Sequence, residues 1–261
     1  MTVLVLNGHR SSVEVQGAGE SVVLVHGLGG TAAQIWKGQI ADLAARYKVV
    51  SYDLRGSGSS EVTEGPYDIE LLTVDLRALI EALELESVAL VAHSMGGSIA
   101  LAYAASYPDD VRALVGIGAP VRLPDAARVA MEARAETVEA DGMSAVAATV
   151  AQNGVSPTFR EERTAEFEEL VAMLAANDPR GYAAQCRALV GLDLGARLGL
   201  ITAPVLLVSG DHDGVSPPAV TEANAALVRD GRFELVEDCG HNLTLEKPEA
   251  LARSAWPFLN V

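Results

Sequence analysis

Short, continuous apolar runs alternate with longer stretches of helical periodicity along most of this chain. The runs are rich in valine and leucine and do not alternate strictly with polar residues, which is typical of strands covered on both faces. They occupy Val22–Val25, Val49–Tyr52, Val88–Ala92, Leu114–Ile117 and Val205–Ser209. A last strand is expected at Arg232–Val236. Thr2–Leu6 and Val13–Gln16, separated by Asn7-Gly8, are expected to form an opening hairpin.

Helical periodicity fills most of the intervals between these strands. The predicted helices are Ala33–Ala45, Ile69–Leu83, Met95–Tyr107, Ala219–Val228 and Pro248–Leu259. Strands that alternate with helices in this way indicate an α/β fold, in which helices cover both faces of a mostly parallel sheet.

The rhythm changes between residues 121 and 195, where no strand pattern is found and alanine is abundant. Asp125 is expected to cap a helix that runs toward Ala140, and Asp178 followed by Pro179 is typical of another helix start. The chain then returns to a sheet strand at Val205. We therefore predict one core domain (residues 1–120 and 196–261) with a helical cap, or lid (residues 121–195), inserted into it.

Composition excludes several function classes. The chain has 35 acidic and 19 basic side chains, a formal net charge of −16, and a nucleic-acid partner would require a basic surface. No window approaches the roughly 20 apolar residues of a membrane span, and the N-terminal residues do not resemble a signal peptide. The two cysteines, Cys186 and Cys239, are expected to be buried thiols. We therefore expect a cytoplasmic protein that binds neither nucleic acid nor membrane.

Ser94 is the candidate nucleophile. It stands between the strand Val88–Ala92 and the helix Met95–Tyr107, with the small residues Ala92 and Gly96 on either side. A sharp strand-to-helix turn strains its central residue, excludes large neighbours and exposes the serine hydroxyl above the sheet. The backbone N–H of Met95, at the helix start, favours negative charge and is a candidate oxyanion-hole donor.

The glycine-rich loop after the strand Val22–Val25 permits two interpretations. Gly27-x-Gly29-x-x-Ala32, with Asp53 after the next strand, matches the pattern of a dinucleotide-binding oxidoreductase. Alternatively, the loop directs the backbone N–H of Leu28 at the serine hydroxyl as the second oxyanion-hole donor. The second interpretation also accounts for Ser94 and for the acid and base described next. Asp53 and Arg55 are then expected to brace their own loop.

A serine nucleophile requires a base held by a carboxylate, and both are expected in loops after later strands. The loop after Val205–Ser209 offers Asp211 and Asp213, and the loop after the last strand offers His241. Asp213 is preferred because it lies three residues after Gly210, in a turn shaped by Gly214 and Pro217. Asp211 remains the alternative. No cluster with metal-ligand spacing is found, so no metal or cofactor is expected.

Together these motifs resemble the α/β-hydrolase superfamily. The resemblance rests on His26-Gly27-x-Gly29, Asp53-x-Arg55-Gly56-x-Gly58-x-Ser60, Ser94 with its neighbours, Gly210-x-x-Asp213 and Gly240-His241. It implies an eight-stranded, mostly parallel sheet, a helical cap and a triad of Ser94, Asp213 and His241. Within the superfamily the chain is similar to the 3-oxoadipate enol-lactonase branch. That similarity rests on Gly142-Met143, Asn177–Tyr182 and Leu192-Asp193-Leu194 before Ile201–Pro204.

The expected function is hydrolysis of a small carboxylic ester or lactone, such as 3-oxoadipate enol-lactone, through an acyl-serine. His26, Met131, Met143 and Phe159 are candidate pocket residues, and the seven arginines of the lid include candidates for binding a substrate carboxylate. Two alternatives use the same fold: a haloperoxidase-like perhydrolase, and a non-catalytic small-molecule binding protein of a signalling type. The sequence leaves the oligomeric state open.

Overall fold

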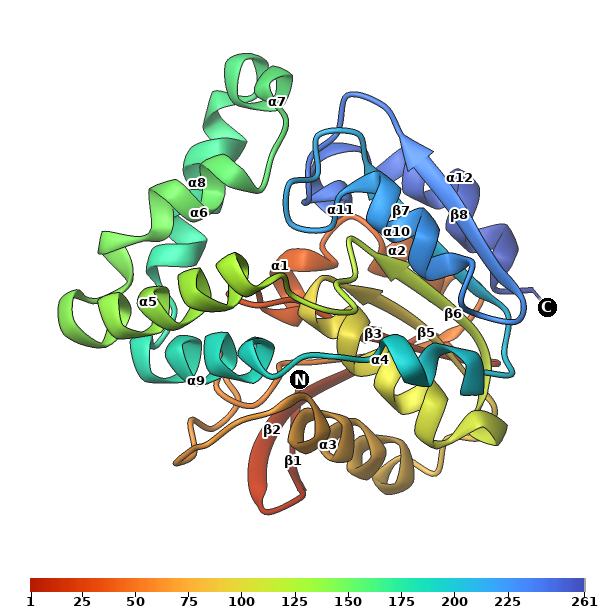
Figure 1. Ribbon diagram of the computed structural model, residues 1–261. Helices are drawn as coiled ribbons and strands as arrows, with labels where there is room; N and C mark the ends of the chain where they lie inside the picture. Colours follow the sequence, from red (N-terminus) through yellow and green to blue (C-terminus); the bar gives the residue numbers. More distant parts are fainter. Residues whose placement is uncertain (261) are drawn as a thin grey trace.

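The computed structural model describes residues 1–260, and an eight-stranded sheet lies at the centre of this part of the chain (Figure 1). The strands are β1 (Thr2–Leu6), β2 (His9–Gln16), β3 (Ser21–Val25), β4 (Lys48–Tyr52), β5 (Val88–His93), β6 (Val111–Ile117), β7 (Val205–Gly210) and β8 (Gly231–Val236). Their order is β1-β2-β4-β3-β5-β6-β7-β8. β1 pairs with β2, and β2 with β4, in antiparallel fashion, whereas β4, β3 and β5 to β8 are parallel. The predicted α/β fold is confirmed.

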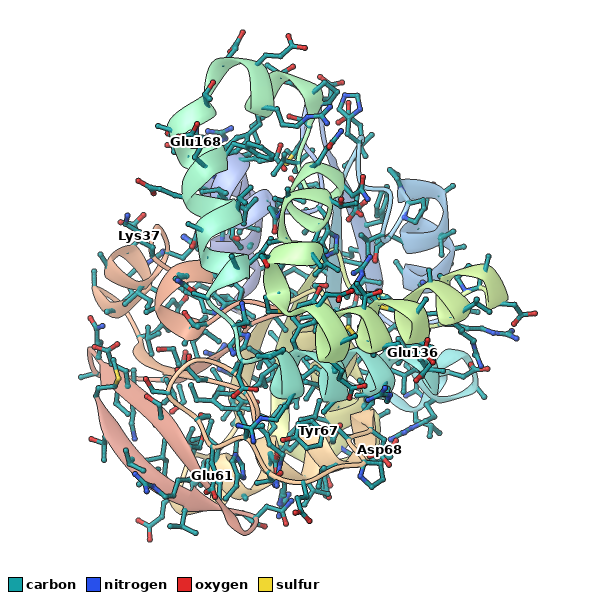
Figure 2. The ribbon with its side chains drawn as sticks, turned by 90° about the vertical axis from the view of Figure 1, so that its left-hand side faces the viewer. Lys37, Glu61, Tyr67, Asp68, Glu136 and Glu168 are labelled. Atoms are coloured by element: carbon teal, nitrogen blue, oxygen red, sulfur yellow. The ribbon has the colours of Figure 1, made fainter. Side chains whose placement is uncertain are left out.

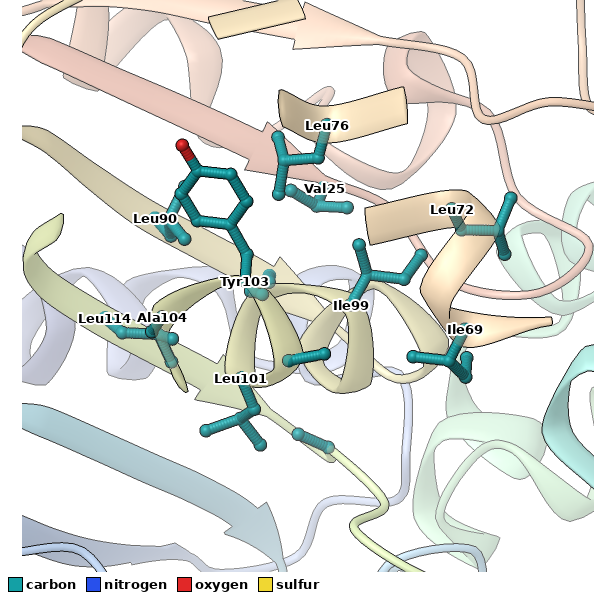
Figure 3. Close-up of a cluster of buried hydrophobic side chains, with 14 of the residues drawn as sticks. Val25, Ile69, Leu72, Leu76, Leu90, Ile99, Leu101, Tyr103, Ala104 and Leu114 are labelled. Atoms are coloured by element: carbon teal, nitrogen blue, oxygen red, sulfur yellow. The ribbon is translucent and has the colours of Figure 1, made fainter. Parts of the chain in front are cut away.

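Helices cover both faces of this sheet. One face packs against α3 (Ile69–Ala82), α4 (Met95–Ser106) and α10 (Pro218–Ala225), and the other against α1 (Ala32–Ile35), α2 (Ile40–Ala44) and α12 (Pro248–Phe258). Strand residues alternate between the two layers, so that Leu90 contacts the first and Val91 the second. Figure 3 shows the first layer, where Ile99 and Tyr103 of α4 pack among the side chains of α3 and the central strands.

The remaining helices come mainly from the segment between β6 and β7. They are α5 (Asp125–Asp141), α6 (Ala147–Asn153), α7 (Pro157–Glu162), α8 (Thr164–Ala175) and α9 (Pro179–Val190), followed later by the short α11 (Leu243–Glu246). We call residues 121–195 the inserted segment. Figure 1 shows its helices beside the sheet, on the side where α1 lies. Figure 2 shows the outside of this segment, with the exposed Glu136 on α5 and Glu168 on α8.

Two local predictions were wrong. The single helix expected at Ala33–Ala45 consists of α1 and α2, because the chain turns at Trp36, which is fully buried and accepts hydrogen bonds from the N–H groups of Gln39 and Ile40. Asp125 does not cap α5: Pro124 holds the capping position and Asp125 is the first helical residue.

The expected start of α9 is confirmed, since the Asp178 carboxylate accepts hydrogen bonds from the N–H groups of Arg180 and Gly181, and Pro179 occupies the first turn. In residues 1–260, no helix combines the length and the apolar character needed to cross a membrane.

Candidate active site

Ser94 forms the turn between β5 and α4. Its φ of 53° and ψ of −123° lie in a region that side chains other than glycine avoid, at a cost of about 1–3 kcal/mol. Close backbone packing enforces this turn, because a Cβ on Gly96 would lie 2.3 Å from the carbonyl oxygen of Val25. The N–H of Ser94 also donates to the carbonyl of Ile117 on β6 at 2.8 Å. The sheet therefore holds the hydroxyl in place at the carboxyl end of β5.

His241 and Asp213 meet Ser94 at this edge of the sheet. His241 Nε2 lies 2.8 Å from Ser94 Oγ, and His241 Nδ1 lies 2.9 Å from Asp213 Oδ2. All three residues are buried, with exposed fractions of 9% or less. Because the Asp213 carboxylate accepts a hydrogen bond from Nδ1–H, the proton of the neutral ring stays on Nδ1, and Nε2 is free to accept the serine proton. The structure thus brings together the three residues that the sequence placed in separate loops.

The environment of Asp213 keeps its carboxylate ionised. Burial alone would raise its pKa, but the pKa is lowered below the ordinary value by the attraction of His241 and by hydrogen bonds from His241 and the N–H groups of Val215 and Ser216. Asp211, the alternative acid, points elsewhere. Its carboxylate accepts the N–H of Cys239 at 2.9 Å, so it braces the turn that leads to His241.

The glycine-rich loop after β3 lies directly against Ser94. A Cβ on Gly27 would be 2.7 Å from the Cβ of Ser94, so only glycine allows this approach. Leu28 follows Gly27 and lines the same cavity as Ser94, while Met95 begins α4. The backbone of both candidate oxyanion-hole residues therefore borders the serine.

The structure does not favour the dinucleotide interpretation of this loop. The carboxylate of Asp53 is already bonded within the protein, accepting the N–H groups of Ala32 and Ser59 at 2.9 Å each. Arg55 is bonded to Asp75 through two of its nitrogens, at 2.8 and 2.6 Å. These groups brace the loops around the site, as expected for Asp53 and Arg55.

His93 is a neighbour of the site that sequence reasoning did not assign. Its Nε2–H donates to the backbone carbonyl of His241 at 3.0 Å, and the two rings lie 5.0 Å apart, tilted by 47°. Burial, reinforced by repulsion from His241, lowers the pKa of His93 to about 3. This imidazole is therefore neutral at ordinary pH and anchors the backbone that carries the candidate base.

Glu246 also supports the His241 loop and was not singled out from sequence. This buried carboxylate accepts the N–H of Gly240 at 3.0 Å and the N–H of Ser156 at 2.8 Å. Burial raises its pKa above the ordinary value. Glu246 thereby links the histidine loop to the inserted segment. In sequence it appears only as one of many acidic residues in a helix start, so no pattern reveals this role.

A cavity of about 100 Å³ opens beside Ser94 and His241. Its walls are mostly apolar and come from both the core and the inserted segment: Leu28, Ile35, Leu123, Met131, Leu170, Met173, Leu174 and Leu189 are among them. The apolar lining suits a small organic substrate.

Of the residues expected in the pocket, Met131 lines this cavity and the other three do not. The His26 ring is fully buried behind the glycine-rich loop, where Nδ1–H donates to the carbonyl of Gly27 and Nε2 accepts the N–H of Leu54. Met143 and Phe159 are buried in two apolar clusters inside the inserted segment. Both side chains pack against neighbouring helices of the inserted segment and do not line the cavity.

Comparison with known proteins agrees with this architecture. A family model described as the alpha/beta hydrolase fold matches residues 20–248. The chain therefore belongs to the α/β-hydrolase family, and it is a hydrolase.

Similar proteins within that family include enol-lactonases and an esterase. It is 31% identical to 3-oxoadipate enol-lactonase 2 of Acinetobacter baylyi over 85% of this chain and 82% of that protein. The enol-lactonase from Burkholderia xenovorans superimposes with a TM-score of 0.95 over 100% of both chains, at 27% identity. A thermophilic esterase from Thermogutta terrifontis gives a TM-score of 0.93 at 26% identity, over 99% of this chain and 97% of that one.

Proposed function

We propose that this hydrolase cleaves a small carboxylic ester or lactone through an acyl intermediate on Ser94. The observation that carries the proposal is the continuous hydrogen-bonded chain from Ser94 Oγ through His241 to Asp213, with distances of 2.8 and 2.9 Å. A serine hydroxyl is a weak nucleophile until a base takes its proton, and this arrangement supplies the base and the group that orients it.

In the first half of the reaction, Ser94 Oγ attacks the substrate carbonyl carbon while its proton passes to His241 Nε2. Asp213 holds the Nδ1–H tautomer and stabilises the imidazolium that forms. The carbonyl oxygen becomes negatively charged in the tetrahedral intermediate, and the N–H groups of Leu28 and Met95 are the proposed donors that stabilise it. When the carbon–oxygen bond breaks, His241 returns the proton to the departing alkoxide.

In the second half, water replaces the leaving group. His241 Nε2 removes a proton from this water as it attacks the acyl carbon, and Ser94 Oγ departs with the proton that His241 gives back. The acid is released and the enzyme is regenerated. For a lactone the leaving alkoxide is part of the same molecule, so the product is a single hydroxy acid or, from an enol-lactone, an oxo acid.

We further propose that the inserted segment is a cap domain that selects the substrate. Met131, Leu170 and Leu174 from this segment line the cavity beside Ser94. The similarity to 3-oxoadipate enol-lactonases supports 3-oxoadipate enol-lactone as the first substrate to test.

The test is a panel of small esters and lactones, including that enol-lactone, assayed with the wild-type protein and Ser94→Ala. Turnover is expected with the wild-type protein, and the substitution should reduce kcat by about 10⁴-fold or more without unfolding the protein. Undiminished hydrolysis by Ser94→Ala would refute the proposal. Absence of wild-type turnover would favour the binding-protein alternative, and faster reaction with peroxide than with water would favour the perhydrolase.

A further inference from the structure

The connection between α6 and α7, residues 154–156, lies against the loop that carries His241. All three residues of the connection are buried. A Cβ on Gly240 would lie 2.7 Å from the Cα of Val155, so backbone packs directly against backbone and only glycine allows the approach. The inserted segment therefore contacts the histidine loop right beside the candidate base.

Asn242, the residue after His241, is bonded twice to this connection. Its backbone N–H and its side-chain Nδ2 both donate to the carbonyl of Gly154, at 2.9 Å each. Asn242 and Gly154 also line the cavity beside Ser94. The contact thus lies between the cavity and the base.

Glu246 ties the backbone on the other side of His241 to the same connection. One oxygen of its carboxylate accepts the N–H of Gly240 at 3.0 Å, and the other accepts the N–H of Ser156 at 2.8 Å. The residue is only 6% exposed, and a carboxylate acceptor forms stronger hydrogen bonds than a neutral one. A single buried side chain therefore bridges the inserted segment and the residue that precedes the base.

The core holds the histidine loop at other groups. Its bonds reach three carbonyls, those of Cys239, His241 and Thr244. The N–H groups that lie between them, of Gly240 and Asn242, are bonded to the inserted segment or to Glu246 instead. Loss of these bonds would free the backbone next to the imidazole to rotate. A displacement of about 1 Å at a reacting group can cost about 100-fold in rate.

We propose that Glu246 is a positioning residue for the proposed reaction: its carboxylate joins the inserted segment to the backbone beside His241 and so keeps the imidazole within bonding distance of Ser94. The inserted segment then does more than line the cavity, because it also sets how well the base is placed to take the serine proton. This inference rests on the function proposed above and adds a residue to its machinery. It predicts a loss in kcat with little change in KM when the bridge is broken.

Glu246→Gln tests the bridge with the smallest change of shape. An amide has one acceptor oxygen and one NH₂ group, so it can bond only one of the two N–H groups that the carboxylate joins. On any ester that the wild-type protein turns over, kcat should fall about 10- to 100-fold, while KM should change by less than about threefold. Urea denaturation verifies that the variant is folded under the assay conditions.

Glu249→Gln is the matched control, because it makes the same chemical change three residues further on, at an exposed position at the start of α12. Its kcat and KM should equal those of the wild-type protein. A kcat for Glu246→Gln equal to that of Glu249→Gln, or a loss confined to KM, would overturn the positioning role.

A pair of substitutions at Ser156 tests the bond from the inserted segment itself, and it carries the kinetic test if Glu246→Gln does not fold. The φ of −63° at Ser156 already suits proline, so Ser156→Pro removes the N–H that Glu246 accepts. It also removes the hydroxyl that caps the N–H of Phe159, and Ser156→Ala removes that hydroxyl alone. Ser156→Pro should have a kcat at least about tenfold below that of Ser156→Ala. Equal kcat values in the two variants would show that the inserted segment does not position the base.

Crystal structures of the wild-type protein and Glu246→Gln separate this inference from the proposed reaction. The distance from His241 Nε2 to Ser94 Oγ, 2.8 Å in the present structure, should exceed about 3.5 Å in the variant, or the imidazole should occupy a second position. If no ester is hydrolysed, the proposed function fails, while this comparison still decides whether Glu246 positions His241. An imidazole that stays in place in the variant would overturn the inference even if the variant is slow.

Discussion

The edge of the sheet that carries Ser94, Asp213 and His241, here called the rim, and the inserted segment line the same cavity in different ways. At the rim, backbone packs against backbone: a Cβ on Gly96 would approach the Val25 carbonyl oxygen to 2.3 Å, and one on Gly210 would approach the Cys239 carbonyl oxygen to 2.2 Å. In the inserted segment, apolar side chains such as Met143 and Phe159 form small separate clusters. Rigid backbone contacts fix reacting atoms closely, whereas side-chain packing tolerates exchange of similar apolar residues. The comparison supports the proposal that the rim carries the chemistry and that the inserted segment selects the substrate.

The largest expected effect distinguishes the two acids at the rim. Asp213→Asn should lower kcat by about 10⁴-fold, because an amide cannot hold the Nδ1–H tautomer or stabilise the imidazolium. Asp211→Asn is the matched control, since an asparagine oxygen can still accept the Cys239 N–H, and it should change kcat by less than about threefold. Steady-state kinetics on any ester that the wild-type protein turns over provides the measurement. The reverse ranking would move the acid to Asp211.

A second prediction concerns a point where the inserted segment, like the rim, packs backbone against backbone. Gly181 on α9 touches the core so closely that a Cβ there would lie 2.1 Å from the carbonyl oxygen of Gly56. Gly181→Ala should therefore destabilise the protein by about 2–3 kcal/mol and displace α9, which contributes Leu189 to the cavity. Gly191→Ala, at the other end of α9, meets nothing within 4 Å and should change stability by less than about 1 kcal/mol. Chemical denaturation measures both, and equal stabilities would show that the contact with Gly56 is not tight.

The smallest effect concerns pH. The pKa of His93 is about 3 in the folded protein, against an ordinary value of 6.5, so between these values the unfolded chain binds a proton that the folded protein does not. The free energy of unfolding therefore has its full value, as far as His93 is concerned, above pH 6.5, and it decreases as the pH drops toward 3. Near pH 5 this contributes a slope of about 1.4 kcal/mol per pH unit.

His93→Gln, whose amide can still donate to the His241 carbonyl, should reduce the slope of unfolding free energy against pH by about that amount. Urea denaturation at several pH values between 4.5 and 5.5 gives the two slopes. Because the comparison uses slopes, an overall loss of stability in the variant does not affect it. Identical slopes would mean that His93 is protonated in the folded state.

The contrast between rim and insertion also explains how far sequence reasoning reaches. The meeting of Ser94, Asp213 and His241 could be predicted from the sequence because each lies in a loop that follows a strand. The carboxyl ends of parallel strands lie at one edge of the sheet, so these loops are neighbours. The two-helix start at α1 and α2 was missed because a buried Trp36 sets the turn, and burial of that kind depends on distant contacts. In the inserted segment, Met143 was expected in the pocket, but an apolar side chain that packs against a neighbouring helix has the same sequence pattern as one that lines a cavity.

The most direct test of the central claim is to trap the acyl group on the protein. Reaction with p-nitrophenyl acetate, quenched in acid within the first turnover and digested, should give a peptide containing Ser94 whose mass is increased by one acetyl group, together with a burst of nitrophenol. Ser94→Ala should show neither the modified peptide nor the burst. Acetylation at another residue would contradict the account. Turnover by the wild-type protein without an acetylated peptide and without a burst would also contradict it, provided that the same procedure detects the acyl group on a known acyl-enzyme.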